Sequence, residues 1–155
     1  MLHKFESTQF IKSDIETTWD FISSPENLAV ITPQYMNFKV INETKPLGKM
    51  YAGQIIEYHV SPLLGIKLKW VTEITHVHDN FYFVDEQRFG PYAFWHHTHF
   101  IKQVEGGVEM IDIVNYKLPF GIFGKIANRL FVKSQLKEIF DYRFNKLEEL
   151  FNNGK

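Results

Sequence analysis

Alternation of apolar and polar residues dominates the chain and predicts seven β-strands. The alternation is clearest in residues 66–78, where Leu68, Trp70 and Ile74 alternate with Lys69 and Glu73. A period of two with short connections is typical of antiparallel hairpins that have one buried face and one solvated face. The predicted strands are residues 2–11, 35–44, 50–60, 66–78, 81–89, 92–104 and 108–118.

Helical patterns appear in two places. After the first strand, Ser13 and Glu16 have the spacing of a capping box, which predicts a short helix through Ile22. Ser24-Pro25 begins a second short helix, and Pro33 ends it. The last segment, from about Gly121 to Phe151, is predicted to be one long helix. Its apolar stripe changes phase near residues 133–135, which indicates a kink or a change of packing partner.

This order of elements predicts the architecture. A sheet with one apolar face needs a cover, and the long terminal helix is the largest element available for it. We therefore expect an α+β domain in which a seven-stranded, curved antiparallel sheet wraps around a long C-terminal helix. Two short helices lie between the first and second strands. The 155 residues, without a repeat or linker, are expected to form a single domain over 1–155.

Predicted turns assign side chains to the two faces of the sheet. A two-residue turn at Asp79-Asn80 places Asp85 and Gln87 on the same inward face as Trp70 and Ile74. The inward set of that strand would be Phe81, Phe83, Asp85, Gln87 and Phe89. Two polar side chains on an apolar face need a partner, a proton or a wetted cavity.

A turn at Gly106-Gly107 pairs His97 with Tyr116 and His99 with Val114. We assign His97 and His99 to the inward face because the opposite face carries more charge. A strict two-residue turn at Gly90-Pro91 would favour the opposite face, so the orientation of strand 92–104 stays open at this point.

Composition sharpens this picture. Fifteen Phe, seven Tyr and three Trp make 16% of the chain aromatic, so the interior is either bulky or lines a space for a bulky molecule. A net charge of −1 gives no electrostatic basis for nucleic-acid binding. The absence of cysteine excludes disulfides and thiolate metal sites. The chain has neither a long apolar run nor a signal-peptide pattern, so we expect a cytoplasmic protein.

A cluster of polar groups among many aromatic residues is the usual composition of a ligand pocket. The alternative is a buried hydrogen-bond network that fixes strand register and binds nothing. The candidate ligand-binding residues are Tyr58, Trp70, Phe83, Asp85, Gln87, Trp95, His97, His99 and Tyr116. They favour a small hydrophobic ligand that has a polar end.

Several runs resemble a known superfamily. They are VDEQRFGPYAFWHHTHF at 84–100, GVEMID at 107–112, YKLPFG at 116–121 and FDYR at 140–143. These runs and the order of elements are similar to the SRPBCC or START-like helix-grip superfamily, in particular to its bacterial ligand-binding subgroup. The superfamily includes the birch-pollen allergen, lipid-transfer domains and polyketide cyclases. The resemblance implies a deep cavity between the sheet and the long helix and leaves the ligand open.

An acid–base enzyme is the alternative to a non-catalytic binding protein. His97 titrates near neutrality, and Tyr116 and Asp112 are placed to orient it, as a cyclase or dehydratase requires. No motif for a redox cofactor or phosphate loop occurs, and we expect no cofactor. His97 and His99 are two residues apart on one face, with Asp112 as the candidate third metal ligand, and His76 and His78 repeat the spacing. A two-residue spacing is a weak metal signal, and we expect no metal.

The remaining hypotheses concern partners. Lys125, Arg129, Lys133 and Lys137 recur every four residues and form a basic stripe on the last helix. Such a stripe contacts anionic lipid or simply faces solvent, and we favour solvent. A protein-interaction module in which the cavity is vestigial is a third functional class. The oligomeric state stays open between monomer and dimer.

Overall fold

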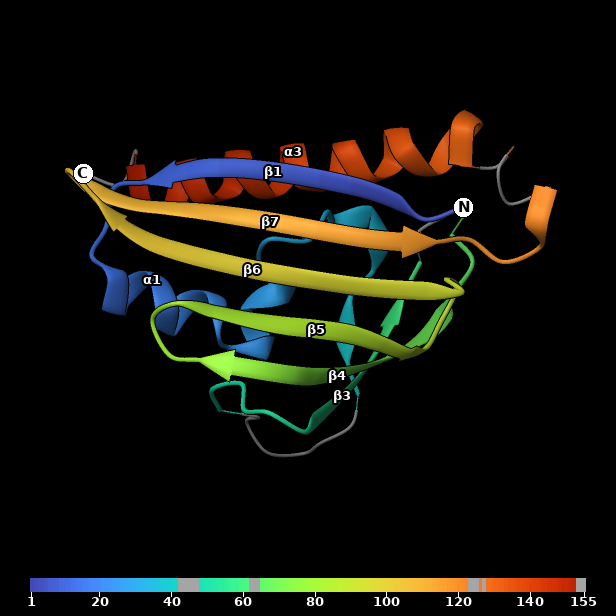
Figure 1. The fold of residues 1–155 in the computed structure, drawn as a ribbon, viewed down its shortest axis with the longest axis horizontal. Coiled ribbons are helices and arrows are strands. Elements are labelled where there is room, and N and C mark those ends of the chain that lie inside the picture. The colour runs from blue at the N-terminus through green and yellow to red at the C-terminus, as the bar shows by residue number, and fades with distance from the viewer. Residues whose placement is uncertain (42–47, 62–64, 123–125, 127, 153–155) are drawn as a thin grey trace.

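The computed structural model describes residues 1–41, 48–61, 65–122, 126 and 128–152. Its centre is a seven-stranded antiparallel sheet in the order β1-β7-β6-β5-β4-β3-β2 (Figure 1). The predicted helix-grip architecture is confirmed, because α3 packs along this sheet as its long cover. The strands are β1 (His3–Ile11), β2 (Lys39–Val40), β3 (Gln54–Val60), β4 (Leu68–His78), β5 (Tyr82–Phe89), β6 (Phe94–Val104) and β7 (Gly107–Lys117).

Two short helices follow β1 as predicted, α1 (Ile15–Ile22) and the 3₁₀ helix η1 (Pro25–Ala29). A third, the 3₁₀ helix η2 (Gln34–Met36), takes the start of the predicted strand 35–44, of which β2 keeps only Lys39–Val40 among the described residues. The residue that caps α1 differs from the prediction. Asp14 rather than Ser13 is the cap, and its Oδ1 accepts a hydrogen bond from the Thr17 amide at 2.7 Å. Its second oxygen accepts from the Thr17 hydroxyl at 2.8 Å, so the carboxylate satisfies two donors where a serine would satisfy one.

The C-terminal helix changes from π-helical to α-helical close to the point where the sequence predicts that its apolar stripe changes phase. A π-helical segment, η3 (Asn128–Val132), is followed by α3 (Lys133–Leu147) and a second π-helical segment, η4 (Glu148–Asn152). A π-helical turn holds more residues than an α-helical turn, so the apolar stripe moves around the helix axis. Residues 123–125 and 127 of the predicted helix lie outside the described part of the chain.

Helix α3 runs alongside β1 in Figure 1, and hydrogen bonds join β1 and the residue that follows it to α3 and η4. The Gln9 side-chain amide donates to the carbonyl of Phe144 at 2.9 Å, and the Lys12 amide donates to Oδ1 of Asn152 at 2.7 Å. Near this end of the sheet, Ile11, Trp19 and Leu147 belong to one buried apolar cluster. The described helices include none that has both the length and the apolar character for crossing a membrane.

The β4–β5 hairpin contains two departures from the predicted register that cancel. The turn has three residues, 79–81, and the Phe81 amide donates to the carbonyl of His78 at 3.0 Å. A β-bulge between Ile74 and His76 then restores the predicted pairs of Ile74 with Asp85 and Thr72 with Gln87.

The prediction that Phe81 and Phe89 point inward is wrong. Their side chains are 49% and 71% exposed. Phe81 belongs to the turn, and a second register shift pairs Phe89 with Val71 rather than with Trp70. A shift of one residue moves a side chain to the other face of the sheet.

In the β6–β7 hairpin, every predicted pair moves by two residues and the inward face stays the same. Gly107 pairs with Val104, so the turn is Glu105-Gly106 instead of Gly106-Gly107. Gly106 has the left-handed φ of +78° that the turn requires. Gly107 is needed for another reason, since a Cβ there would lie 2.3 Å from the carbonyl oxygen of Ile11 on β1.

The shift of two residues changes which side chains face each other. Trp95 lies opposite Tyr116, His97 opposite Val114, and His99 opposite Asp112, so the predicted pair of His97 with Tyr116 is wrong. The inward assignment is correct: His97, His99 and Asp112 are 4%, 6% and 2% exposed.

Candidate functional site

A cavity of about 270 Å³ lies between the sheet and α3. Phe83, Trp70 and Ile74 are among its walls on the sheet side, and Leu136, Ile139 and Phe140 are among those on α3. Seven of the nine predicted ligand-binding residues line it: Tyr58, Trp70, Phe83, Asp85, Trp95, His97 and His99.

The other two predicted residues, Gln87 and Tyr116, do not line the cavity. The amide of Gln87 donates to the carbonyl of Tyr92 at 2.7 Å and accepts from the Tyr92 backbone N–H at 3.1 Å. It therefore closes the β5–β6 connection. Tyr116 is buried in a cluster with Val114, Leu136 and Phe140, two residues along β7 from Val114, which is the partner of His97.

Stacked aromatic rings form one wall of the cavity. Trp70 stacks on Tyr58 with ring centroids 5.9 Å apart, and its ring meets Trp95 edge-on at 5.3 Å. The Tyr58 hydroxyl shares a hydrogen bond of 3.0 Å with Thr72, and burial raises the pKa of this hydroxyl well above its usual value. The phenol is therefore neutral. The Trp70 indole N–H is buried and finds no hydrogen-bond acceptor among the described residues.

Two histidines and two aspartates form a compact group that we call the His–Asp cluster (Asp85, His97, His99 and Asp112). Oδ1 of Asp112 lies 2.9 Å from Nε2 of His97 and 2.8 Å from Nδ1 of His99. Oδ2 of Asp85 lies 2.9 Å from Nε2 of His99 and 3.3 Å from Nδ1 of His97. The imidazole rings lie between the two carboxylates, with centroids 3.7 Å apart.

Strand pairing explains why these four side chains meet. His97 and His99 are two residues apart on β6 and point to the same face. Asp85 on β5 is the direct partner of His97, and Asp112 on β7 is the direct partner of His99. The cluster is thus built from three adjacent strands by register alone.

Neighbouring side chains hold the cluster in place. The Trp95 indole donates to Oδ1 of Asp85 at 3.2 Å. The ring of Phe83 stacks on His99 at 4.1 Å, and the ring of Phe140 meets His97 edge-on at 5.7 Å. These contacts leave the histidine rings little rotational freedom.

Arg143 on α3 is a cavity residue that the sequence reasoning missed. Its Nη1 lies 3.6 Å from Oδ1 of Asp112, and its guanidinium lies over the ring of Phe140 at 4.8 Å from the centroid. Its Nε is buried and has no hydrogen-bond partner among the described residues. The signal that could have revealed it is the position of Arg143 in the apolar stripe with Phe140 and Leu147, which predicts that its side chain is buried. A buried arginine needs an anionic partner, so this position predicts a carboxylate nearby.

Electrostatics within the cluster favour ionised carboxylates. Burial by itself raises the pKa of Asp85, but the charge and hydrogen bonds of His97 and His99 hold that pKa well below its usual value. Burial also raises the pKa of Asp112, but hydrogen bonds from the same two histidines outweigh burial and hold this pKa well below its usual value. For His97, burial lowers the pKa, but the Asp85 charge and the Asp112 hydrogen bond raise it above its usual value.

The arrangement brings only part of the predicted acid–base set together. His97 and Asp112 are in hydrogen-bond contact at 2.9 Å, whereas Tyr116 stands opposite Trp95. His97 lines the cavity and Asp112 lies behind it, which is the order in which a carboxylate orients a proton-transferring histidine.

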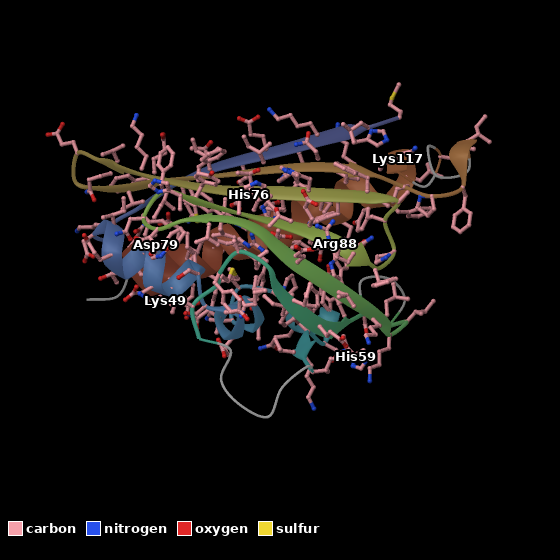
Figure 2. All side chains as sticks on the ribbon, turned by 60° about the horizontal axis from the view of Figure 1, so that its bottom comes forward. Lys49, His59, His76, Asp79, Arg88 and Lys117 are labelled. Carbon is pink, nitrogen blue, oxygen red and sulfur yellow. The ribbon has the colours of Figure 1, made fainter. Side chains whose placement is uncertain are left out.

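A metal would meet a different set of ligands from the one considered in the sequence. Asp85, His97 and His99 offer three ligand atoms that all lie within 4.8 Å of one another. Asp112, the carboxylate suggested by sequence spacing, contacts the far nitrogens of the two rings. The other histidine pair, His76 and His78, is exposed near the end of β4, and Figure 2 labels His76 there.

The basic stripe of the last helix is only partly described. The side chains of Lys125 and Arg129 lie outside the described part of the chain. Lys133 is exposed, and Lys137 forms an ion pair with Asp141 at 2.5 Å.

Comparison with known proteins gives matches in structure and none in sequence. No protein-family profile and no curated protein matches the chain. The ZhuI aromatase/cyclase from Streptomyces sp. R1128 superposes with a TM-score of 0.72 at 12% identity, covering 95% of this chain and 92% of that one. Protein CV1439 from Chromobacterium violaceum has a TM-score of 0.72 at 10% identity and covers 96% of both chains.

A third solved structure agrees with these two. Protein Ms6760 from Mycobacterium smegmatis superposes with a TM-score of 0.68 at 14% identity, covering 95% of this chain and 89% of that one. At such identities the likeness concerns the fold and says nothing of a shared activity. The chain has the helix-grip fold that these solved structures share.

Proposed function

We propose that the chain binds a small apolar molecule with a polar end in the cavity between the sheet and α3. The observation that carries the proposal is a cavity of about 270 Å³ whose walls are mostly aromatic and aliphatic. The ionisable groups on its wall are Asp85, His97 and His99 of the His–Asp cluster together with Arg143, and Thr32, Thr72 and Gln135 are the other polar lining residues. This volume is just below the roughly 300–1,000 Å³ of small-molecule pockets. It suits a compact ligand, such as one with two fused rings.

The polar end of the ligand is expected to be a hydrogen-bond acceptor. Trp70 Nε1 and Arg143 Nε are buried donors on the cavity wall without an acceptor among the described residues. A buried donor left without an acceptor costs about 1–3 kcal/mol. A carbonyl, phenolate or carboxylate oxygen on the ligand would satisfy such donors, so we expect an acidic or carbonyl-bearing ligand.

Matched probes test this proposal. 2-Naphthoate carries an acceptor and naphthalene does not, and titration calorimetry should show that 2-naphthoate binds more tightly. Trp70→Phe keeps an aromatic ring and removes the donor, so it should weaken 2-naphthoate binding about 10-fold, the equivalent of one hydrogen bond. Trp19→Phe is the control, because Trp19 is buried but does not line the cavity, and it should leave the affinity unchanged.

Two results would contradict the proposal. One is that neither compound binds to the folded protein and that native mass spectrometry of freshly purified protein finds no organic molecule. The other is that Trp19→Phe weakens binding as much as Trp70→Phe, which would place the probes outside the cavity.

An acid–base reaction in the same cavity is the second candidate function. The pair of His97 and Asp112 favours it, and so does the likeness in fold to an aromatase/cyclase. If this function holds, a poly-β-ketone thioester should cyclise faster with the protein than without it. His97→Asn should abolish the acceleration, while the exposed control His76→Asn should retain it.

A further inference from the structure

The His–Asp cluster has more contacts between imidazole nitrogens and carboxylates than neutral rings can satisfy. All four ring nitrogens of His97 and His99 lie within 3.3 Å of an aspartate oxygen. Two neutral imidazoles carry two N–H groups, so two of these contacts would set a nitrogen lone pair against a carboxylate oxygen. The cluster therefore has room for additional positive charge between the rings and Asp85.

We infer that Asp85, His97 and His99 bind one divalent transition-metal ion at the wall of the cavity. The ligand atoms are Oδ2 of Asp85, Nδ1 of His97 and Nε2 of His99. Two imidazole nitrogens and one carboxylate oxygen form a set that suits zinc, iron, cobalt or nickel.

The distances in the cluster are compatible with a shared ion. Ligands at about 2.1 Å from a metal are separated by roughly 3.0–3.4 Å when the angle between them is octahedral or tetrahedral. Oδ2 of Asp85 lies 2.9 Å from Nε2 of His99 and 3.3 Å from Nδ1 of His97. All three ligand atoms lie within 4.8 Å of one another, so small side-chain rotations complete the site.

The remaining contacts orient these three ligands. Metal-bound histidines usually donate their other N–H to a carboxylate or carbonyl. Oδ1 of Asp112 is placed to accept from both far nitrogens, at 2.9 Å and 2.8 Å, and Arg143 lies 3.6 Å from the same oxygen. The Trp95 indole holds Oδ1 of Asp85, which leaves Oδ2 for the ion.

The open side of this site faces the cavity. Asp85, His97 and His99 line the cavity, whereas Asp112 does not. Coordination positions that the protein leaves free would therefore point toward the space that a ligand occupies. This inference does not depend on the proposed ligand, since the ion can bind whether or not 2-naphthoate does.

The first experiment uses the tag-free wild-type protein, dialysed against a chelator and then titrated with Co²⁺ and with Zn²⁺. We expect one ion per chain, with visible Co²⁺ absorption that added Zn²⁺ displaces. Long-range ¹H–¹⁵N spectra of the Zn²⁺-loaded protein should show His97 bound through Nδ1 and His99 through Nε2. This readout needs no variant and is specific for the proposed geometry.

Variants then locate the ion. Asp112→Asn should weaken Co²⁺ binding about 10–100-fold, as expected when a carboxylate that supports metal-bound histidines is removed. Asp85→Asn, which removes a ligand, should weaken it more. The double variant His76→Ala/His78→Ala removes two exposed histidines with the same spacing and should bind Co²⁺ as the wild type does.

Three results would overturn the inference. They are the absence of stoichiometric binding by the wild type, the loss of binding in the His76→Ala/His78→Ala variant, and metal on the opposite nitrogens of His97 and His99. If Asp85→Asn fails to fold, the spectra of the wild type still decide. Failure of 2-naphthoate to bind would contradict only the proposed function.

Discussion

Two histidine pairs with the same spacing occupy contrasting places on the sheet. His76 and His78 are exposed on β4, where the ring of His78 lies against Phe81 and Tyr82. His97 and His99 are buried on β6 between two aspartates. The His-x-His spacing is therefore uninformative by itself. What distinguishes the buried pair is the carboxylate that each adjacent strand places directly opposite it.

Removing a carboxylate from the buried pair should produce the largest effect. Asp112→Ala removes the carboxylate nearest to the buried Arg143 and leaves His97 with Asp85 alone, so we expect the free energy of unfolding to fall by about 3–5 kcal/mol. Urea denaturation measures this change. Asp79→Ala, in the exposed turn beside His78, is the matched control (Figure 2). An equal effect of the two variants would remove the distinction between the pairs.

Truncating a histidine of the buried pair should cost less. His97→Ala deletes contacts to both aspartates and leaves their oxygens buried, which predicts a loss of about 1–3 kcal/mol. A double-mutant cycle with Asp112→Ala should give a coupling energy of about 0.5–3 kcal/mol, because the two side chains are in direct contact. Strict additivity of the two substitutions would contradict the hydrogen bond that joins them.

The pH dependence of the buried pair should be smaller still, since only charge is altered. Asp85 and Asp112 have lowered pKa values, so their contribution to stability is present above about pH 3.8 and is lost as the pH falls further. His97 has a raised pKa, so its contribution is complete below about pH 6.5 and is lost as the pH rises through that raised value.

The difference in stability between the metal-free wild type and His97→Gln should therefore be greatest between about pH 4 and 6.5. Urea midpoints for both proteins across pH 3–9 measure it. A difference that grows steadily above pH 6.5 would show that His97 is stabilised in its neutral form.

Substitution of the exposed pair should have the smallest effect. His76→Ala and His78→Ala should each change the free energy of unfolding by no more than about 0.5 kcal/mol, the usual range for surface positions. Thermal denaturation of each variant is a sufficient test. A loss greater than 1 kcal/mol would indicate that the β4–β5 turn depends on these rings.

The sequence predicts the fold well because strand alternation, turn residues and the terminal helix agree. It predicts the inward face of β6 and β7 despite an error in the turn, because a displacement of two residues preserves the face. It fails for Phe81 and Phe89, where a three-residue turn and a register shift move side chains by one position. Bulges depend on how neighbouring strands pack, and alternation within one strand does not reveal them.

The candidate site was predictable in its composition and not in its contacts. Inward placement of Asp85, His97 and His99 follows from alternation. The pairing of Asp112 with both imidazoles requires the true register, which depends on the close approach of Gly107 to β1. Arg143 is separated by 31 positions from Asp112 in the chain, so only the packing of α3 reveals their contact.

The sheet order has a consequence for how the chain folds. β1 pairs with β7, and Ser7 lies opposite Asp112, so the first strand must wait for the last before the sheet is complete. Closing a loop of about a hundred residues is entropically costly, and folds dominated by such distant pairings form slowly. During synthesis, the strands β3 to β6 on the sheet side of the cavity are therefore made before α3, while β1, which is made first, stays unpaired until β7 follows. Until β1 and α3 have both docked, this aromatic interior is a surface that chaperones can bind and at which chains can aggregate.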